Sequence, residues 1–317
     1  MRLILPLFLF LLFYSGNPLD EPSSFNLCEQ IEIKDNVMFA WPSDGNSSEK
    51  HIVHSGIKTS TGILEKVGKN CFAGLAGIYG YDYLNKKQVC YINFEDGYIC
   101  SLKESEAMYL AENGFSEVDS NFKINSFSIS ILIKRRKFDF KFDTGFEGTF
   151  ALPYKSNIPF LKDSHAVLEC LETSSTKPEH YIERSYSRKS IGFNGIYYGS
   201  AITVSQGLKL PKVGMGFLKG FNWIIDFKNN KIYARKNSKS IDTFPDNNEY
   251  TCNAIDDKLI IIKKRAQRDD YSLGAEIKSV NNLLVTRENL CEMLDLLHTT
   301  SDWKSLQLTV SNLNNAK

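Results

Sequence analysis

Two stretches of the chain repeat one pattern, and this repetition limits the folds open to it. The first, residues 80–99, reads GYDYLNKKQVCYINFEDGYI, and the second, residues 214–232, reads GMGFLKGFNWIIDFKNNKI. Each begins with Gly, passes through an aromatic residue and Leu into an apolar run, and continues through Ile-Asn/Asp-Phe into a two-residue turn. The turns, Asp96-Gly97 and Asn229-Asn230, use residue types that accept the positive φ of tight hairpins. We interpret the pair as an internal duplication, in which each half carries a similar β-hairpin.

Strand patterns dominate the chain up to about residue 235. Residues 126–133 (SFSISILI) and 138–145 (FDFKFDTG) alternate polar and apolar side chains, and the basic run at 134–137 is expected to be the solvated turn between them. Residues 104–115 predict a short helix that ends at Asn113-Gly114. A polar linker after residue 238 leads to a last unit with a strand at 259–264, an amphipathic helix within 286–300 that Thr286 caps, and a closing strand at 306–310.

The chemistry-bearing motif is Asp143-Thr144-Gly145, at the end of the second alternating strand. Aspartic proteases present a catalytic carboxylate on such a triplet. They pair it with a second carboxylate, and because the two cannot both ionise they share one proton. The ionised member activates a water and the protonated member binds the peptide carbonyl. Thr144 would brace the loop, and Gly145 would let backbone approach the carboxylate. Taken alone, the triplet also fits an ordinary Asp where a strand meets a turn.

The chain resembles the retropepsin-like aspartic proteases of bacteria that carry a C-terminal PDZ-like domain. The resemblance rests on the strand, turn and strand before Asp143, on the stretch from Val213 through the second repeat, and on GIYGYDYL at 77–84. It implies a mainly β fold of two pepsin-like lobes followed by a small α/β domain. The expected divisions are a signal peptide at 1–16, a shortened first lobe at 25–103, a second lobe at 120–237 and the PDZ-like domain at 250–312.

The PDZ-like resemblance concerns residues 273–297, where Gly274 and the stretch Val280-Asn281-Asn282 occupy the places of the PDZ central motif. Such domains bind a chain end by adding a strand beside an edge strand, and residues 259–264 are the candidate edge. A packing domain without a ligand fits the same residues.

The first lobe lacks an Asp-Thr/Ser-Gly triplet, and Phe146 follows the second one where the family has Ala or Ser. The nearest candidate, Asp44 in AWPSDG, lacks the residue between Asp and Gly and fits a loop better than a catalytic partner. Two alternatives follow. A homodimer could supply Asp143 twice, or the protein could be a degenerate relative that binds peptides. The expected function is therefore aspartic-type peptide hydrolysis through Asp143 on a peptide or protein substrate, with an exported peptide-binding or scaffold protein as the alternative.

The N-terminus indicates export, because one Arg precedes about a dozen apolar residues, too few for a membrane span. We expect a periplasmic, secreted or cell-envelope protein of a bacterium, or one held by an uncleaved N-terminal anchor. The seven cysteines fit no zinc pattern, and a Cys90–Cys100 bridge across one hairpin is conceivable. Most of the cysteines are expected to be buried, inert thiols. The histidines show no ligand spacing, so neither metal nor cofactor is expected, and a net charge of +1 gives no case for nucleic acid.

Overall fold

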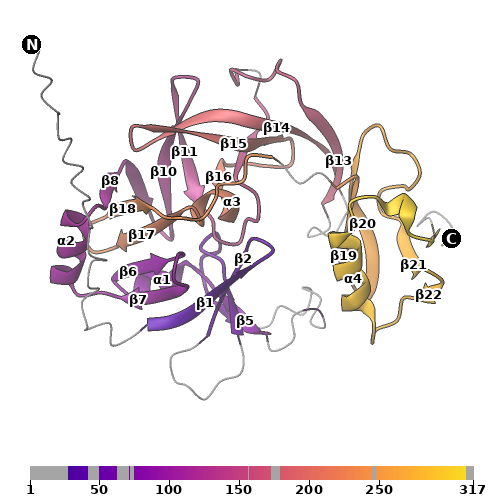
Figure 1. Ribbon diagram of the computed structural model, residues 1–317, viewed down its shortest axis with the longest axis horizontal. Helices are drawn as coiled ribbons and strands as arrows, with labels where there is room; N and C mark the ends of the chain where they lie inside the picture. Colours follow the sequence, from indigo (N-terminus) through magenta and orange to yellow (C-terminus); the bar gives the residue numbers. More distant parts are fainter. Residues whose placement is uncertain are drawn as a thin grey trace, which may run out of the picture.

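The structure is a computed structural model that describes residues 28–41, 50–62, 71, 75–155, 157–172, 179–244 and 248–311. These residues fold mainly into β-strands, which form two extended sheets. We call residues 28–103 the first half, 120–237 the second half and 250–311 the C-terminal unit (Figure 1). The expected signal peptide and Asp44 lie outside the described residues.

The first sheet joins strands from both halves. Its order is β4 (Thr61–Gly62), β5 (Leu75–Tyr79), β3 (Lys50–Val53), β2 (Val37–Ala40), β1 (Cys28–Lys34), β7 (Tyr98–Ser101), β6 (Val89–Asn93), β17 (Phe221–Asp226), β18 (Lys231–Lys236) and β8 (Ser116–Val118).

The second sheet joins the second half to the C-terminal unit. Its order is β22 (Leu283–Leu284), β21 (Glu276–Val280), β20 (Lys258–Arg265), β13 (Ala166–Glu172), β14 (Glu179–Phe193), β15 (Ile196–Ser205), β12 (Phe150–Pro153), β16 (Lys212–Val213), β11 (Arg136–Phe142), β10 (Ser126–Ile133) and β9 (Ser120–Lys123), with β19 (Tyr250–Ile255) beside β20 and β23 (Leu308–Ser311) beside β21. The helical segments are α1 (Tyr81–Lys86), α2 (Glu104–Glu112), α3 (Met215–Leu218), α4 (Leu290–Thr299) and the 3-10 turn η1 (Trp303–Ser305).

The two copies of the repeated pattern lie side by side. Each copy folds as a short helix and a hairpin, α1–β6–β7 in the first half and α3–β17–β18 in the second. Strand β6 pairs antiparallel with β17, with Trp223 opposite Ile92 and Ile225 opposite Cys90. Gly80 and Gly214 are the N-caps of the two helices. The repeated segments therefore meet in one sheet across the boundary between the halves.

Alternation in the second half produces the expected hairpin. Strands β10 and β11 pair through Ile133 and Arg136, and the turn residues Lys134 and Arg135 both have positive φ, of 45° and 67°. The inward side chains of these strands join a core that both halves share, in which Phe142 packs edge-on against Trp223. This packing fixes the end of β11, where Asp143 follows.

The C-terminal unit has a core of its own and is joined to the rest of the molecule by a disulfide and by a strand pairing. Leu290, Met293 and Leu297 of α4 pack into that core, as the amphipathic pattern predicts. A disulfide joins Cys71 of the first half to Cys291 of α4. Strand β20 also pairs with β13 of the second half, and Figure 1 shows the unit beside that strand.

Two expectations about this unit are wrong. Residues 259–264 do not form an edge strand, because β20 pairs with β19, β21 and β13. Thr286 does not cap the helix, which begins at Leu290 with Asn289 as its N-cap residue. Asn289 Oδ1 instead accepts a hydrogen bond from the Thr286 amide and closes a turn before the helix.

The conceivable Cys90–Cys100 bridge is also wrong. Cys100 bonds to Cys28, because β1 pairs with β7 and places the two residues opposite each other. Cys90, Cys170 and Cys252 are buried thiols, and burial raises the pKa of each to about 12. Two disulfides are compatible with an exported protein. No helix in the described part of the chain is both long and apolar enough to cross a membrane.

Candidate functional site

The predicted triplet lies at the boundary between the two halves. Asp143 follows β11, and its amide donates to the carbonyl of Val213 on the parallel strand β16 (3.0 Å). Thr144 is fully buried, and the Asp143 side chain is only 1% exposed. The Asp-Thr-Gly triplet therefore lies directly after a strand of the second sheet, in a buried position.

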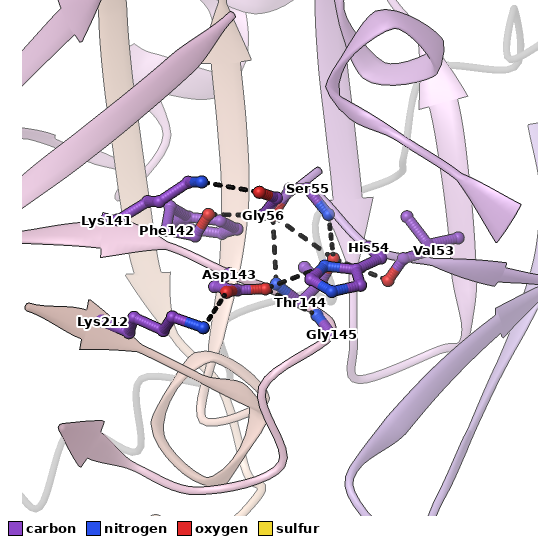
Figure 2. A network of polar contacts seen from close by, with 10 residues as sticks. All are labelled: Val53, His54, Ser55, Gly56, Lys141, Phe142, Asp143, Thr144, Gly145 and Lys212. Carbon is purple, nitrogen blue, oxygen red and sulfur yellow. Dashed lines mark hydrogen bonds and ion pairs between the residues drawn. The ribbon is translucent and has the colours of Figure 1, made fainter. Parts of the chain in front are cut away.

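A second triplet, His54-Ser55-Gly56, faces the first one (Figure 2). It follows β3 as Asp143-Thr144-Gly145 follows β11. The His54 amide donates to Tyr79 on the parallel strand β5 (2.8 Å), which repeats the bond between Asp143 and Val213. Each loop then forms the same tight turn, because the Ile57 amide donates to the backbone carbonyl of His54 and the Phe146 amide donates to that of Asp143 (both 3.1 Å). The two loops have the same backbone design.

Ser55 and Thr144 lock the loops together by a reciprocal set of hydrogen bonds. The Ser55 amide donates to Thr144 Oγ1 (2.9 Å), and the Thr144 amide donates to Ser55 Oγ (3.0 Å). Each hydroxyl also donates across the boundary, Ser55 Oγ to the Phe142 carbonyl (2.9 Å) and Thr144 Oγ1 to the Val53 carbonyl (2.7 Å). All four groups are buried, where an unmade hydrogen bond is costly. The frame therefore fixes the positions of the residues that precede Ser55 and Thr144.

Each glycine of the two triplets makes room for the functional side chain of the other. A Cβ on Gly145 would lie 2.2 Å from Cγ of His54, and a Cβ on Gly56 would lie 2.3 Å from Oδ1 of Asp143. Real Cβ atoms do not approach other atoms so closely. Glycine is thus required at both places if His54 and Asp143 are to face each other.

His54 and Asp143 form the chemical centre of the frame. Nδ1 of His54 lies 3.0 Å from Oδ1 of Asp143, and the imidazole is 27% exposed while the carboxylate is buried. Nδ1 has no aligned hydrogen-bond partner among the described residues, so the contact is an ion pair when the ring is protonated.

Three neighbours set the charge of Asp143. Burial favours the neutral acid and acts to raise its pKa, but His54, Lys212 and the Gly145 amide act in the opposite direction and outweigh it, so the pKa of Asp143 lies below its ordinary value. Lys212 Nζ lies 3.5 Å from Oδ2, and the Gly145 amide donates to Oδ1 (3.1 Å). The carboxylate is therefore ionised at neutral pH.

One chain supplies both halves of this frame. The partner of the Asp143 loop is the His54 loop of the same molecule, so the geometry requires no second copy of Asp143. Within the described ranges, no group of three His, Cys, Asp or Glu side chains lies close enough to hold a metal ion. The arrangement offers a carboxylate base and an imidazole that can act as an acid.

Sequence reasoning missed His54, Ser55 and Gly56. They do not fit the Asp-Thr/Ser-Gly pattern, because His54 stands in the place of the Asp. In the second half, strands β13, β14 and β15 lie between the triplet and its glycine, whereas far fewer residues separate His54 from Gly80. The available signal was the pair Ser55-Gly56, one residue after the apolar Ile52-Val53. The chain matches no protein-family model, and no curated protein matches it.

Proposed function

We propose that this protein is a peptide hydrolase in which His54 replaces one of the two carboxylates of a retropepsin-like aspartic protease. One observation carries the proposal: the reciprocal bonds of Ser55 and Thr144 hold His54 and Asp143 face to face, 3.0 Å apart, on two loops of the same design. The two-lobed pepsin-like architecture and the PDZ-like nature of the C-terminal unit form part of the same proposal. The paired repeats and the shared core of the two halves support the first of these.

The chemistry follows from the charges of the pair. Asp143 accepts a proton from a water molecule, whose oxygen adds to the peptide carbonyl carbon. The protonated imidazole of His54 donates a hydrogen bond to the developing oxyanion. When the carbon–nitrogen bond breaks, the leaving nitrogen takes the proton from His54. Asp143 then returns its proton to His54, which restores the starting state with no covalent intermediate.

A second candidate function is peptide binding without cleavage. It is favoured by the low pKa of Asp143, because His54 and Lys212 hold this carboxylate in its charged form and it cannot share a proton as in a two-carboxylate site. In this function the frame would only maintain the boundary between the halves.

Cleavage of a diverse peptide mixture separates the two functions. The purified protein is incubated with the mixture between pH 3 and 8, beside Asp143→Asn, and products are identified by mass spectrometry. We expect new termini that are absent from the Asp143→Asn sample. A folded wild-type protein that produces no new termini at any pH would overturn the hydrolase and leave the binding protein.

A further inference from the structure

The two sides of the His54–Asp143 pair differ in charge. Strands β3 and β5 pair in parallel, and so do β11 and β16. Ile52 lies two positions before His54 and Lys141 lies two positions before Asp143, so these two residues occupy equivalent places. On the first side these pairs place Ile52 opposite Ile78, and on the second side they place Lys141 opposite Lys212. Residues two apart on a strand point to the same face, so each pair lies on the face that carries His54 or Asp143.

The isoleucine side is closed and apolar. Ile52 and Ile78 are 9% and 7% exposed, and they form a small cluster with Phe39 that Ile57 and Trp41 help to cover. The equivalent of Phe39 on the second side is Ser128, which lies opposite Lys141 as Phe39 lies opposite Ile52. The second side therefore lacks the large apolar residue that closes the first.

The lysine side is more open and carries two ammonium groups. Lys212 is 36% exposed, with its Nζ 3.5 Å from Asp143, and Lys141 Nζ donates to the Gly56 carbonyl (2.6 Å). Figure 2 shows both lysines on the side of Asp143 away from His54. Of these two ammonium groups only that of Lys212 is paired with Asp143, while that of Lys141 is held at the Gly56 carbonyl.

We propose that the site prefers a peptide with a carboxylate side chain, Asp or Glu, on the lysine side of the pair, where Lys212 binds it. Lys212 is the binding group because its side chain is 36% exposed, whereas the ammonium group of Lys141 already donates to the Gly56 carbonyl. An extended peptide across His54 and Asp143 places one side chain next to the reacting bond on each side. This inference rests on the proposed function, because that function is what places an extended peptide across the His54–Asp143 pair.

Binding and cleavage of matched peptide pools test the preference separately. Two partly randomised decapeptide pools differ only in a central Glu or Gln, and their retention by immobilised His54→Ala protein, which does not consume them, is compared by mass spectrometry. Cleavage of the same pools by the wild-type protein is measured in parallel. The preference is expressed in both assays as the Glu/Gln ratio, the signal of the Glu pool divided by that of the Gln pool. We expect retention of the Glu pool to be about five- to tenfold higher, and less so at high salt because the attraction is screened.

Variants locate the charge that is responsible. In Lys212→Met the Glu/Gln ratio should fall to near one, and Lys212→Arg should retain most of it. Lys209→Met is the control, because it removes an exposed lysine of the segment that leads into β16. The ratio of Glu-pool to Gln-pool retention is compared because loss of Lys212 also removes its ion pair with Asp143, which affects both pools equally.

Each outcome decides one of the two ideas. Equal retention of both pools, retention of neither, or a ratio unchanged in Lys212→Met would overturn the carboxylate preference, even if the wild-type protein cleaves both pools. A Glu preference that depends on Lys212, without cleavage by the wild-type protein, would support the preference and overturn the hydrolase.

Discussion

Ser55 and Thr144 exchange backbone-to-hydroxyl hydrogen bonds in both directions, with the Ser55 amide 2.9 Å from Thr144 Oγ1 and the Thr144 amide 3.0 Å from Ser55 Oγ. The two residues lie 89 positions apart in the sequence, yet their loops act as one structural element. The stability of the boundary between the halves and the position of the reactive pair therefore depend on the same few bonds.

Removing one hydroxyl of this frame should destabilise the fold. Thr144→Val keeps the shape of the side chain but leaves the Ser55 amide and the Val53 carbonyl without their partner. We expect a loss of about 1–3 kcal/mol in the free energy of unfolding, measured by urea denaturation. Thr144→Ser keeps the hydroxyl and is the matched control. Equal stability of the two variants would show that the bonds contribute little.

A methyl group on Gly145 should disable the site with less effect on the fold. The new Cβ would lie 2.2 Å from the His54 ring, so the imidazole must leave its place opposite Asp143. Peptide cleavage should fall by at least about 100-fold, because small misplacements of reacting groups are costly. Gly199→Ala is the control, since its Cβ would come no nearer than 3.8 Å to Thr243. Gly145→Ala protein with normal activity would contradict the assigned position of His54.

The charge of Asp143 should make stability depend on pH in a defined direction. Its pKa is lower in the folded protein than in the unfolded chain, so the unfolded chain takes up the proton first as the pH falls. The stabilisation is therefore complete above the ordinary Asp pKa of about 3.9 and is lost as the pH falls through the lower folded value. Urea denaturation of the wild type and Asp143→Asn between pH 2 and 7 measures it. The difference between them should shrink only below about pH 4, and a constant difference would argue against an ionised, stabilising carboxylate.

Replacing His54 by Asp should change the pH at which the site works. Two carboxylates so close share one proton, so activity then requires one to be protonated, which occurs only in acid. The pH profile of kcat/KM should shift to lower pH in His54→Asp relative to the wild type. His54→Asn, which can neither accept nor release a proton, should be inactive. An unchanged profile in His54→Asp would show that His54 takes no part in proton transfer.

Much of the fold could be predicted from local patterns, and the paired site could not. Alternation defines β10 and β11, and the repeated hairpins lead to the β6–β17 pairing. The disulfides depend on contacts between distant segments, 72 and 220 residues apart, which no local pattern encodes. His54 could not be identified from the sequence because it is not an Asp. In addition, fewer residues lie between its triplet and Gly80 than between Asp143-Thr144-Gly145 and Gly214. Only the folded backbone shows that Ser55 is the counterpart of Thr144.

The most direct test of the account compares four proteins with one cleaved peptide: the wild type, His54→Ala, Asp143→Asn and the double variant. If His54 and Asp143 work as one unit, each single change should lower kcat/KM by about 1000-fold or more. The kcat/KM of the double variant should then equal that of the less active single variant. All four must first be shown to fold by circular dichroism. A His54→Ala protein that keeps most of its activity, or a double variant whose loss is the product of the two single losses, would contradict a joint His54–Asp143 site.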